Sequence, residues 1–326
     1  MQNDFLAREF GKHAILTSLR HSPGNDGEAL SLKVTPTTIA IVGAGRVGRA
    51  LGRQLRESGW HITSVVTRSE ASARRAAGFI GAGRPFGRLS RLILETRVVL
   101  ITAPDDAVAG LAEQLAHIGG EEWNGKIILH TSGALDSRAL ASLQRAGANV
   151  GSIHPLQSFS SRVAPSLDGV WMVIEGMPKA LKVARRIARD LGGVPVHVRI
   201  GDKSAYHAAG VFSAAHVLAL IETGTRILTS VGFSRRQASL ALLKLSRQVL
   251  SNFERFGANV AWSGPAARGD FGTIAGNMKA LKKFPIEYAE AYATAHRLGA
   301  RVLARRPEAV LAKLKLALQS SQRRRK

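Results

Sequence analysis

A glycine-rich turn between an apolar run and an amphipathic stretch constrains the fold of this chain more than any other feature. Residues 38–42 read Thr-Ile-Ala-Ile-Val, and Gly43, Ala44, Gly45, Arg46, Val47 and Gly48 follow directly. Glycine first permits a tight turn, then lets the backbone approach a pyrophosphate, and finally lets a helix pack closely on the strand. Gly-x-Gly-x-x-Gly between a strand and a helix is the dinucleotide fingerprint, so we expect residues 43–48 to bind a dinucleotide. A glycine-rich turn without a ligand is the alternative.

The second apolar run, residues 61–66, indicates which dinucleotide to expect. It ends at Thr67, Arg68 and Ser69, and Arg68 lies twenty residues after Gly48. An NAD-binding chain carries Asp or Glu at about this distance, whereas a guanidinium group between hydroxyls suits the 2′-phosphate of NADP. We therefore expect NADP, held in part by these three residues. A solvated arginine at a strand end is the alternative.

Strand-like and helical stretches alternate along the first two thirds of the chain. Further strands are expected at residues 97–102, 126–131, 149–154, 170–174 and 195–198, with helices at 108–117, 139–145 and 179–191. This alternation is typical of a parallel, doubly wound α/β sheet. After Gly201 only helical patterns follow, at residues 204–231, 234–253, 270–281 and 286–305 and from 309 onward.

Four segments are therefore expected. Residues 1–36 form a variable extension, residues 37–199 the dinucleotide-binding sheet domain, residues 200–320 an all-α domain for substrate binding or dimerisation, and residues 321–326 a basic tail.

Composition excludes several classes of protein. The 326 residues include no Cys, which rules out disulfides, thiolate nucleophiles and cysteine-bound metals. The longest near-apolar run, residues 208–221, is too short to span a bilayer, and no signal peptide precedes the sheet, so a cytoplasmic protein is expected. The net charge of +23 is spread along the chain without interleaved aromatic residues, which predicts no specific nucleic-acid binding.

Candidate site residues follow the strands of the expected sheet, because ligands bind at the carboxyl ends of strands in such folds. Ala103 and Pro104 would lie along the cofactor, and Ser132 and Gly133 could donate hydrogen bonds to a substrate oxyanion. His154 is the best titratable candidate there, with a structural hydrogen bond as the alternative.

Two further candidates come from the helical half. Lys203 and His207 are four residues apart and share a helix face, so both could move protons, although a solvent-exposed lysine is the alternative. His216, deeper in the apolar run, is expected to be a satisfied core histidine. Arg268 stands at a turn before Asp270, where it could grip a carboxylate or pair with Asp270. No metal site is expected, and no Gly-x-Ser-x-Gly motif of a serine hydrolase is present.

Several motifs together resemble a bacterial family of Rossmann-like proteins whose C-terminal half is domain of unknown function 2520. The similar segments are residues 41–48, 130–134, 151–159, 206–209 and 264–270. The family resembles, more distantly, pyrroline-carboxylate reductase, ketopantoate reductase and the β-hydroxyacid dehydrogenases. This resemblance implies a Rossmann domain that binds NADP, a helical domain, and a homodimer formed through the helices. It also implies that Lys203 and His207 match the spacing of a catalytic lysine and asparagine in the β-hydroxyacid dehydrogenases, with histidine replacing asparagine.

The resulting hypothesis is an NADP-dependent oxidoreductase. Hydride would pass to or from a small, anionic carbonyl, hydroxyl or imine substrate bound between the two domains, with His154, Lys203 and His207 as the catalytic residues. Ser132, Gly133 and Arg268 would bind the substrate. A non-catalytic, NADP-responsive sensor or scaffold is the alternative.

Overall fold

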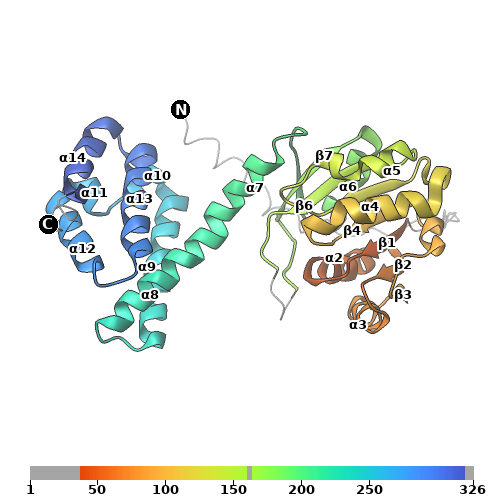
Figure 1. The fold of residues 1–326 in the computed structure, drawn as a ribbon, viewed down its shortest axis with the longest axis horizontal. Helices are drawn as coiled ribbons and strands as arrows, with labels where there is room; N and C mark the ends of the chain where they lie inside the picture. Colours follow the sequence, from red (N-terminus) through yellow and green to blue (C-terminus); the bar gives the residue numbers. More distant parts are fainter. Residues whose placement is uncertain (1–36, 160–163, 320–326) are drawn as a thin grey trace, which may run out of the picture. The chain divides into compact units, whose positions relative to one another are not determined.

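The computed structural model describes residues 37–159 and 164–319 (Figure 1). The expectations for an extension at residues 1–36 and a basic tail at 321–326 lie outside the described residues.

Eight strands form one sheet in the order β3-β2-β1-β4-β5-β6-β7-β8. They are β1 (Thr38–Val42), β2 (His61–Val66), β3 (Arg84–Phe86), β4 (Val98–Ile101), β5 (Ile127–His130), β6 (Asn149–Pro155), β7 (Trp171–Gly176) and β8 (Val194–His197). Residues 39–42 of β1 are fully buried, as expected for a central strand covered on both faces. In the register of β1, Ile41 lies opposite Val65 of β2 and Leu100 of β4. The expected α/β sheet is confirmed.

One pairing in the sheet differs from the expected parallel order. Strands β6 and β7 are antiparallel, with Ile153 opposite Ile174, while the other neighbouring pairs are parallel. To pair in parallel with β6, the next strand would have to start at the same end of the sheet as β6, and the connection that carries the chain back there usually contains a helix. The described parts of the connection between these strands form no helix, so the chain re-enters the sheet from the opposite end.

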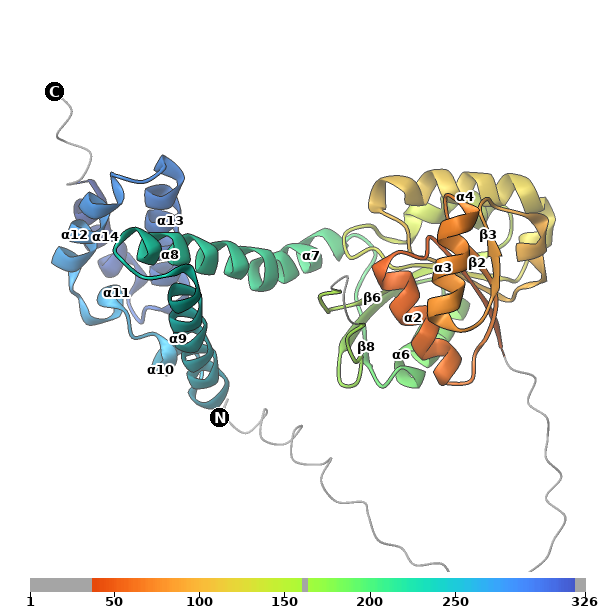
Figure 2. The same ribbon diagram turned by 90° about the horizontal axis from the view of Figure 1, so that it is seen from below.

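Helices cover both faces of the sheet (Figure 2). One hydrophobic core joins the sheet to α2 (Arg46–Glu57), α3 (Glu70–Ile80) and α6 (Pro178–Asp190). The core on the other face joins it to α4 (Asp105–Gly119), α5 (Ala141–Arg145) and the 3-10 helices η1 (Arg91–Glu95), η2 (Gly120–Trp123) and η3 (Ser137–Leu140). The sheet is therefore doubly wound, as the alternation in the sequence predicts.

After β8 the described secondary-structure elements are all helices, joined by short turns. The helices are α7 (Lys203–Val211), α8 (Val217–Ser230), α9 (Arg235–Phe256), α10 (Ala258–Ala261), α11 (Pro265–Arg268), α12 (Phe271–Leu281), α13 (Ile286–Leu303) and α14 (Pro307–Gln319). Residues of α11 to α14, among them Ile274 and Leu314, form a separate hydrophobic core.

A π-helical turn, η4 (Phe212–His216), joins α7 and α8 into one continuous helix (Figure 1). The prediction that His216 is a buried core histidine is wrong, because this side chain is exposed and meets the ring of Phe212 edge to face. The sequence shows an apolar run but not which of its faces finds a partner within the chain.

By length and composition alone, the helix Lys203–Ser230 is apolar enough to cross a membrane, with a mean hydropathy of 1.4 in its most apolar window. None of that window is buried within the chain. The whole helix is longer than the run of residues 208–221 from which no membrane span was expected. Helix α8, the second part of this long helix, packs on α9. The two helices are so close that a Cβ added at Gly224 of α8 would lie 3.0 Å from a methyl group of Leu242 on α9.

Candidate functional site

The glycine turn after β1 has the geometry that its sequence predicts. Gly43 has a φ of +88°, and a Cβ on it would lie 2.8 Å from the backbone nitrogen of Ala103. A Cβ on Gly48 would lie 2.2 Å from Oγ1 of Thr102, whose hydroxyl donates to the carbonyl of Gly43. By contrast, a Cβ on Gly45 would meet only the Gly43 carbonyl, at 3.9 Å. The first and third glycines therefore fit the turn to β4, and the second leaves its outer side open.

The start of helix α2 is suited to an anion. Gly45 occupies the N-cap position without a side-chain cap, and the first turn contains no acidic residue. The positive end of the helix dipole and the free N–H groups of this turn face outward from the sheet edge. Together with the space beside Gly45, this cradle fits the pyrophosphate of a dinucleotide.

The three residues after β2 have different environments. Thr67 donates its hydroxyl to the carbonyl of Ser69, and the Ser69 hydroxyl caps α3 by accepting from the N–H of Ser72. Arg68 is exposed and makes no hydrogen bond or ion pair with another described residue. Its guanidinium group is therefore available to a ligand at the carboxyl end of β2.

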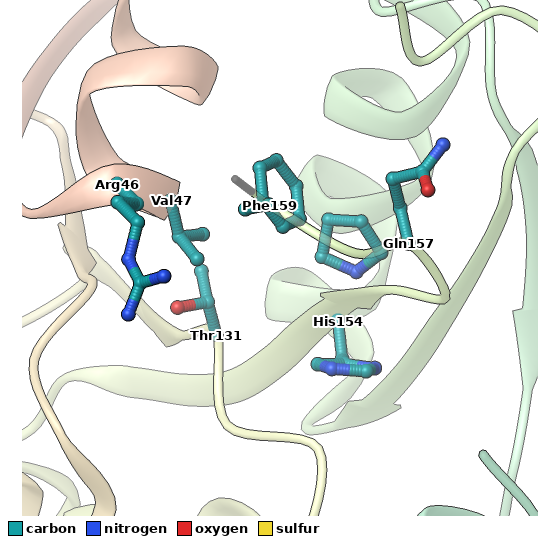
Figure 3. A pocket seen from close by; sticks show the side chains of 7 residues that line it. Arg46, Val47, Thr131, His154, Gln157 and Phe159 are labelled. Carbon is teal, nitrogen blue, oxygen red and sulfur yellow. The ribbon is translucent and has the colours of Figure 1, made fainter. Parts of the chain in front are cut away.

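A cavity of about 300 Å³ opens at the carboxyl edge of the sheet (Figure 3). Its lining residues come from the start of α2 and from the ends of β5 and β6. They are Arg46, Val47, Thr131, His154, Pro155, Gln157 and Phe159. Arg46 and Val47 lie on one side and Gln157 and Phe159 on the other (Figure 3). The cavity thus brings the predicted cofactor turn and the predicted residue His154 to one place.

His154 is held by a residue that the sequence did not single out. Its Nδ1 lies 2.6 Å from the hydroxyl of Tyr206 in the first turn of α7, and the two rings meet edge to face. Burial, followed by the charges of Lys203, His207 and His130, lowers the pKa of His154 to about 4. His154 is therefore neutral near pH 7. Burial raises the pKa of Tyr206 to about 12, so the phenol is neutral as well.

Gly133 keeps two histidine rings close to the backbone. A Cβ on Gly133 would lie 2.9 Å from Nε2 of His154 and 2.7 Å from Cδ2 of His207. The ring centroids of these histidines are 6.4 Å apart. Only glycine fits at this position without displacing a ring, so Gly133 shapes the space around both side chains.

His130, the last residue of β5, holds the turn that carries Ser132 through two hydrogen bonds. Nδ1 of this buried histidine accepts from the N–H of Ser132 at 3.2 Å, and Nε2 lies 3.1 Å from the carbonyl of Asp136. The Ser132 hydroxyl accepts from the N–H groups of Ala134 and Leu135. Its oxygen is therefore engaged in the turn, and the side chain is buried.

Lys203 lies deeper than its position at a helix start suggests. Only 1% of its surface is exposed, and its ammonium group donates to the carbonyl of Ser132 at 2.7 Å and to Oγ of Ser152 at 3.2 Å. Burial lowers the pKa of Lys203 to about 8, although the Glu175 carboxylate acts in the opposite direction. Lys203 thus ties α7 to β6 and to the turn after β5, while the half-buried His207 lies one turn further on.

Arg268 stands at the end of α11 and donates to the carbonyl of Ser263 at 2.6 Å. Asp270 caps α12 through Thr273 and forms no salt bridge with Arg268. The exposed guanidinium group of Arg268 therefore keeps further donors for a ligand. Within the described part of the chain, no group of three or more His, Asp or Glu side chains is placed to hold a metal ion.

The structure gathers most of the predicted site at one sheet edge. Ala103 packs against the glycine turn, and Ser132, Gly133, His154, Lys203 and His207 are linked by the contacts above. Pro104 is exposed at the start of α4, and no contact links Arg268 to these residues. Sequence reasoning missed the roles of Tyr206, Glu175 and Phe159. Phe159 lies five residues after His154, in the segment of residues 151–159 that resembles the family, and this position was the available signal.

Comparisons with known proteins agree with this architecture. Two family models match: a Rossmann-like domain at residues 22–155 and the domain of unknown function DUF2520 at residues 170–298. No curated protein matches the chain.

Three solved structures illustrate the likeness. A provisionally assigned NADP oxidoreductase from Bacteroides fragilis is 20% identical, with a TM-score of 0.66, over 83% of this chain and 99% of its own. A protein from Thermotoga maritima is 24% identical, with a TM-score of 0.64, over 79% and 97%. An imine reductase from Myxococcus stipitatus in complex with NADP+ is 16% identical, with a TM-score of 0.60, over 82% and 94%. These likenesses show a shared fold, and the two family models match consecutive parts of the chain, the Rossmann-like model first and the DUF2520 model after it.

Proposed function

We propose that this protein is an NADP-dependent oxidoreductase that transfers a hydride to or from a small, anionic carbonyl, hydroxyl or imine compound. One observation carries the proposal: a single cavity is lined both by the glycine turn at the start of α2 and by His154. A dinucleotide cradle beside a group that can donate a hydrogen bond to the reacting atom is what stabilises the charge that develops during hydride transfer. Structural neighbours that are imine reductases, one in complex with NADP+, support it.

The residues that would hold the cofactor fit it. The turn at residues 43–48 offers backbone N–H groups and space beside Gly45 for the pyrophosphate, and Arg68 offers its guanidinium group to a 2′-phosphate. The bound cofactor would supply or accept the hydride.

In this proposal His154 acts on the oxygen or nitrogen of the reacting group. Because its pKa is near 4, the ring is neutral and serves as a hydrogen-bond donor where charge develops. Lys203 holds the carbonyl of Ser132 and so fixes the turn that carries Gly133. His207 lies beside Gly133 and His154. Arg268, which no described contact links to the cavity, stays the predicted ligand of an anionic group of the substrate.

The test is a screen for substrate-dependent change in nicotinamide absorbance with small keto acids, hydroxy acids and cyclic imines. With an active compound, His154→Asn should lower kcat about a hundredfold while leaving the Kd for NADP unchanged. Binding of NADP without turnover of any compound would favour the alternative, a cofactor-responsive sensor. No binding of either nicotinamide dinucleotide would refute both.

The preference for NADP has its own test. Removing the guanidinium group in Arg68→Ala should weaken NADP binding by about ten- to a hundredfold, since a hydrogen bond to a charged group contributes about 1.5–3 kcal/mol. The Kd for NAD should not change. Arg74→Ala is the matched control, because Arg74 is also exposed but already paired with Glu70 on α3. If calorimetry shows that Arg68→Ala weakens the binding of NADP and of NAD equally, Arg68 does not select the 2′-phosphate.

The proposed homodimer rests on a long apolar surface. Leu218 and Leu220 of α8 and Leu240, Leu245 and Leu250 of α9 are each more than half exposed in the single chain. Exposed apolar surface of this extent is typical of an interface between subunits. We propose that a second copy of this chain covers it.

A further inference from the structure

Tyr206 of α7 forms a short hydrogen bond with the cavity-lining residue His154. The Tyr206 oxygen lies 2.6 Å from Nδ1 of His154, and the ring planes meet at 78° with centroids 5.6 Å apart. Among the described residues, neither the Tyr206 hydroxyl nor the His154 ring has another hydrogen-bond partner. Among the described residues, this contact is therefore the hydrogen bond that orients the imidazole.

The direction of the hydrogen bond follows from the donors available. A neutral imidazole carries its proton on either Nδ1 or Nε2, while a phenol has one proton and can also accept. In either arrangement one proton has no acceptor among the described residues, the phenol proton or the proton on Nε2, so donor and acceptor strength decide the direction. A phenol hydroxyl is a stronger donor than a neutral imidazole N–H, and an imidazole nitrogen is a stronger acceptor than a phenol oxygen. The phenol therefore donates, and Nδ1 is the acceptor. The proton of the imidazole is then on Nε2.

The position of Nε2 gives this tautomer a use. Nε2 faces the backbone of Gly133, where a Cβ would approach it to 2.9 Å, and His154 is part of the cavity wall that also contains Thr131 and Arg46 (Figure 3). A hydrogen on Nε2 therefore points to the side of Gly133, the predicted substrate-binding residue, while Nδ1 is bonded to Tyr206 of α7. The other tautomer would present a lone pair on that side instead of a donor.

We propose that Tyr206 is a positioning residue that donates to Nδ1 of His154 and thereby holds the imidazole with its proton on Nε2, facing the substrate. This inference rests on the proposed function, because it assigns Nε2–H to the oxygen or nitrogen of the reacting carbonyl, hydroxyl or imine group. Burial, followed by the charges of Lys203, His207 and His130, lowers the pKa of this imidazole and keeps it neutral.

The first experiment reads the tautomer directly, by nitrogen–proton correlation NMR of the histidine side chains in the full-length protein without substrate. His154→Asn identifies the His154 signals by their loss. The wild type should show a protonated Nε2 and an unprotonated Nδ1, and Tyr206→Phe should convert a substantial fraction to the Nδ1–H form. Tyr292→Phe is the matched control, because it loses a comparable hydrogen bond, from Asn277, on α13. A wild type protonated on Nδ1, or an unchanged tautomer in Tyr206→Phe, would overturn the inference.

The second experiment uses turnover. With an active substrate, Tyr206→Phe should lower kcat roughly tenfold while the Kd for NADP stays the same, and Tyr292→Phe should leave both unchanged. Unchanged kcat in Tyr206→Phe would count against the positioning role. The two experiments separate the two proposals: the tautomer can be read even if no compound is turned over, and an active enzyme with the wrong tautomer would refute only the role of Tyr206.

Discussion

The ammonium group of Lys203 belongs to a buried polar cluster that crosses from α7 to β6 and β7. Lys203 donates to Ser152, and Glu175 lies opposite Ser152 in the antiparallel register. One carboxylate oxygen of Glu175 accepts from Ser137, and the other has no hydrogen-bond partner among the described residues. A buried carboxylate and a buried ammonium in one cluster compensate each other, although they form no direct salt bridge.

Lys203→Met and Glu175→Gln should therefore be coupled. Each single change leaves the opposite charge buried and uncompensated, so each should lower the free energy of unfolding by about 3 kcal/mol. The double variant removes both charges and should lose about 1–3 kcal/mol less than the sum of the single losses. Urea denaturation of the four proteins measures this difference. Strict additivity would mean that the two charges do not sense each other.

His130 makes stability depend on pH. Burial, followed by the charge of Lys203, lowers the pKa of His130 from 6.5 to about 4. Between pH 6.5 and pH 4, His130 is therefore protonated in the unfolded chain and neutral in the folded one. Stability should therefore be fully present above about pH 6.5 and should fall as the pH drops toward 4, by up to about 3 kcal/mol from this group.

His130→Asn isolates that contribution, because asparagine can still accept from the N–H of Ser132 but does not titrate. The variant should be less stable than the wild type at pH 7 and should lose less stability between pH 7 and pH 4.5. Denaturant midpoints at both pH values measure the effect. Parallel losses in the two proteins would assign the acid sensitivity to other groups, including His154, which titrates in the same range.

Helix α2 and strand β4 approach each other at Gly48 more closely than any side chain would allow. Since the Cβ of an alanine would lie 2.2 Å from the Thr102 hydroxyl, the helix start must move away from the turn, or the hydrogen bond from Thr102 to Gly43 must break. Either change displaces the N–H groups that face the proposed pyrophosphate.

Gly48→Ala should therefore lower NADP affinity at least tenfold and reduce stability by about 1–3 kcal/mol. Gly78→Ala on α3 is the matched control, because a Cβ there meets nothing within 4 Å. That control should bind NADP normally and gain up to about 1 kcal/mol from its higher helix propensity. Calorimetric binding and thermal denaturation test both variants, and normal NADP binding by Gly48→Ala would show that the turn is not the pyrophosphate site.

Within the described part of the chain, helices α8 and α9 leave large apolar side chains uncovered. Leu218 on α8 is 69% exposed and Leu245 on α9 is 61% exposed, whereas the sheet is covered on both faces by the chain's own helices. A charge placed in the centre of a subunit interface cannot be desolvated without cost. A substitution of leucine by glutamate should therefore weaken association at an interface position and leave association unchanged at a surface position outside the interface.

We expect Leu218→Glu to convert the dimer to a monomer in light scattering coupled to size-exclusion chromatography. Leu316→Glu on α14 is the matched control, because Leu316 is 71% exposed but belongs to a different helix. It should leave the dimer intact. A wild type that is monomeric at micromolar concentration would contradict the proposed dimer and leave the apolar helix to another partner.

Local sequence patterns determined the scaffold. Strands β1 and β2, the turn at Gly43 and the start of α2 follow from apolar runs and from glycine at three positions, because these preferences act over a few residues. The three-residue strand β3, with Arg84 and Pro85, was not predicted because it is too short to show a period. The direction of β7 was also missed, since strand polarity depends on the path of the connection.

Only the tertiary structure decided how the candidate site is assembled. His154 and Tyr206 are 52 residues apart, and Lys203 is 71 residues from its partner Ser132, so no local spacing relates them. The same holds for burial. His216 lies outside, against the expectation, and Lys203, for which an exposed position was the alternative, lies inside. Side-chain burial and pairing are set by which surfaces meet, and that depends on the packing of elements distant in the chain.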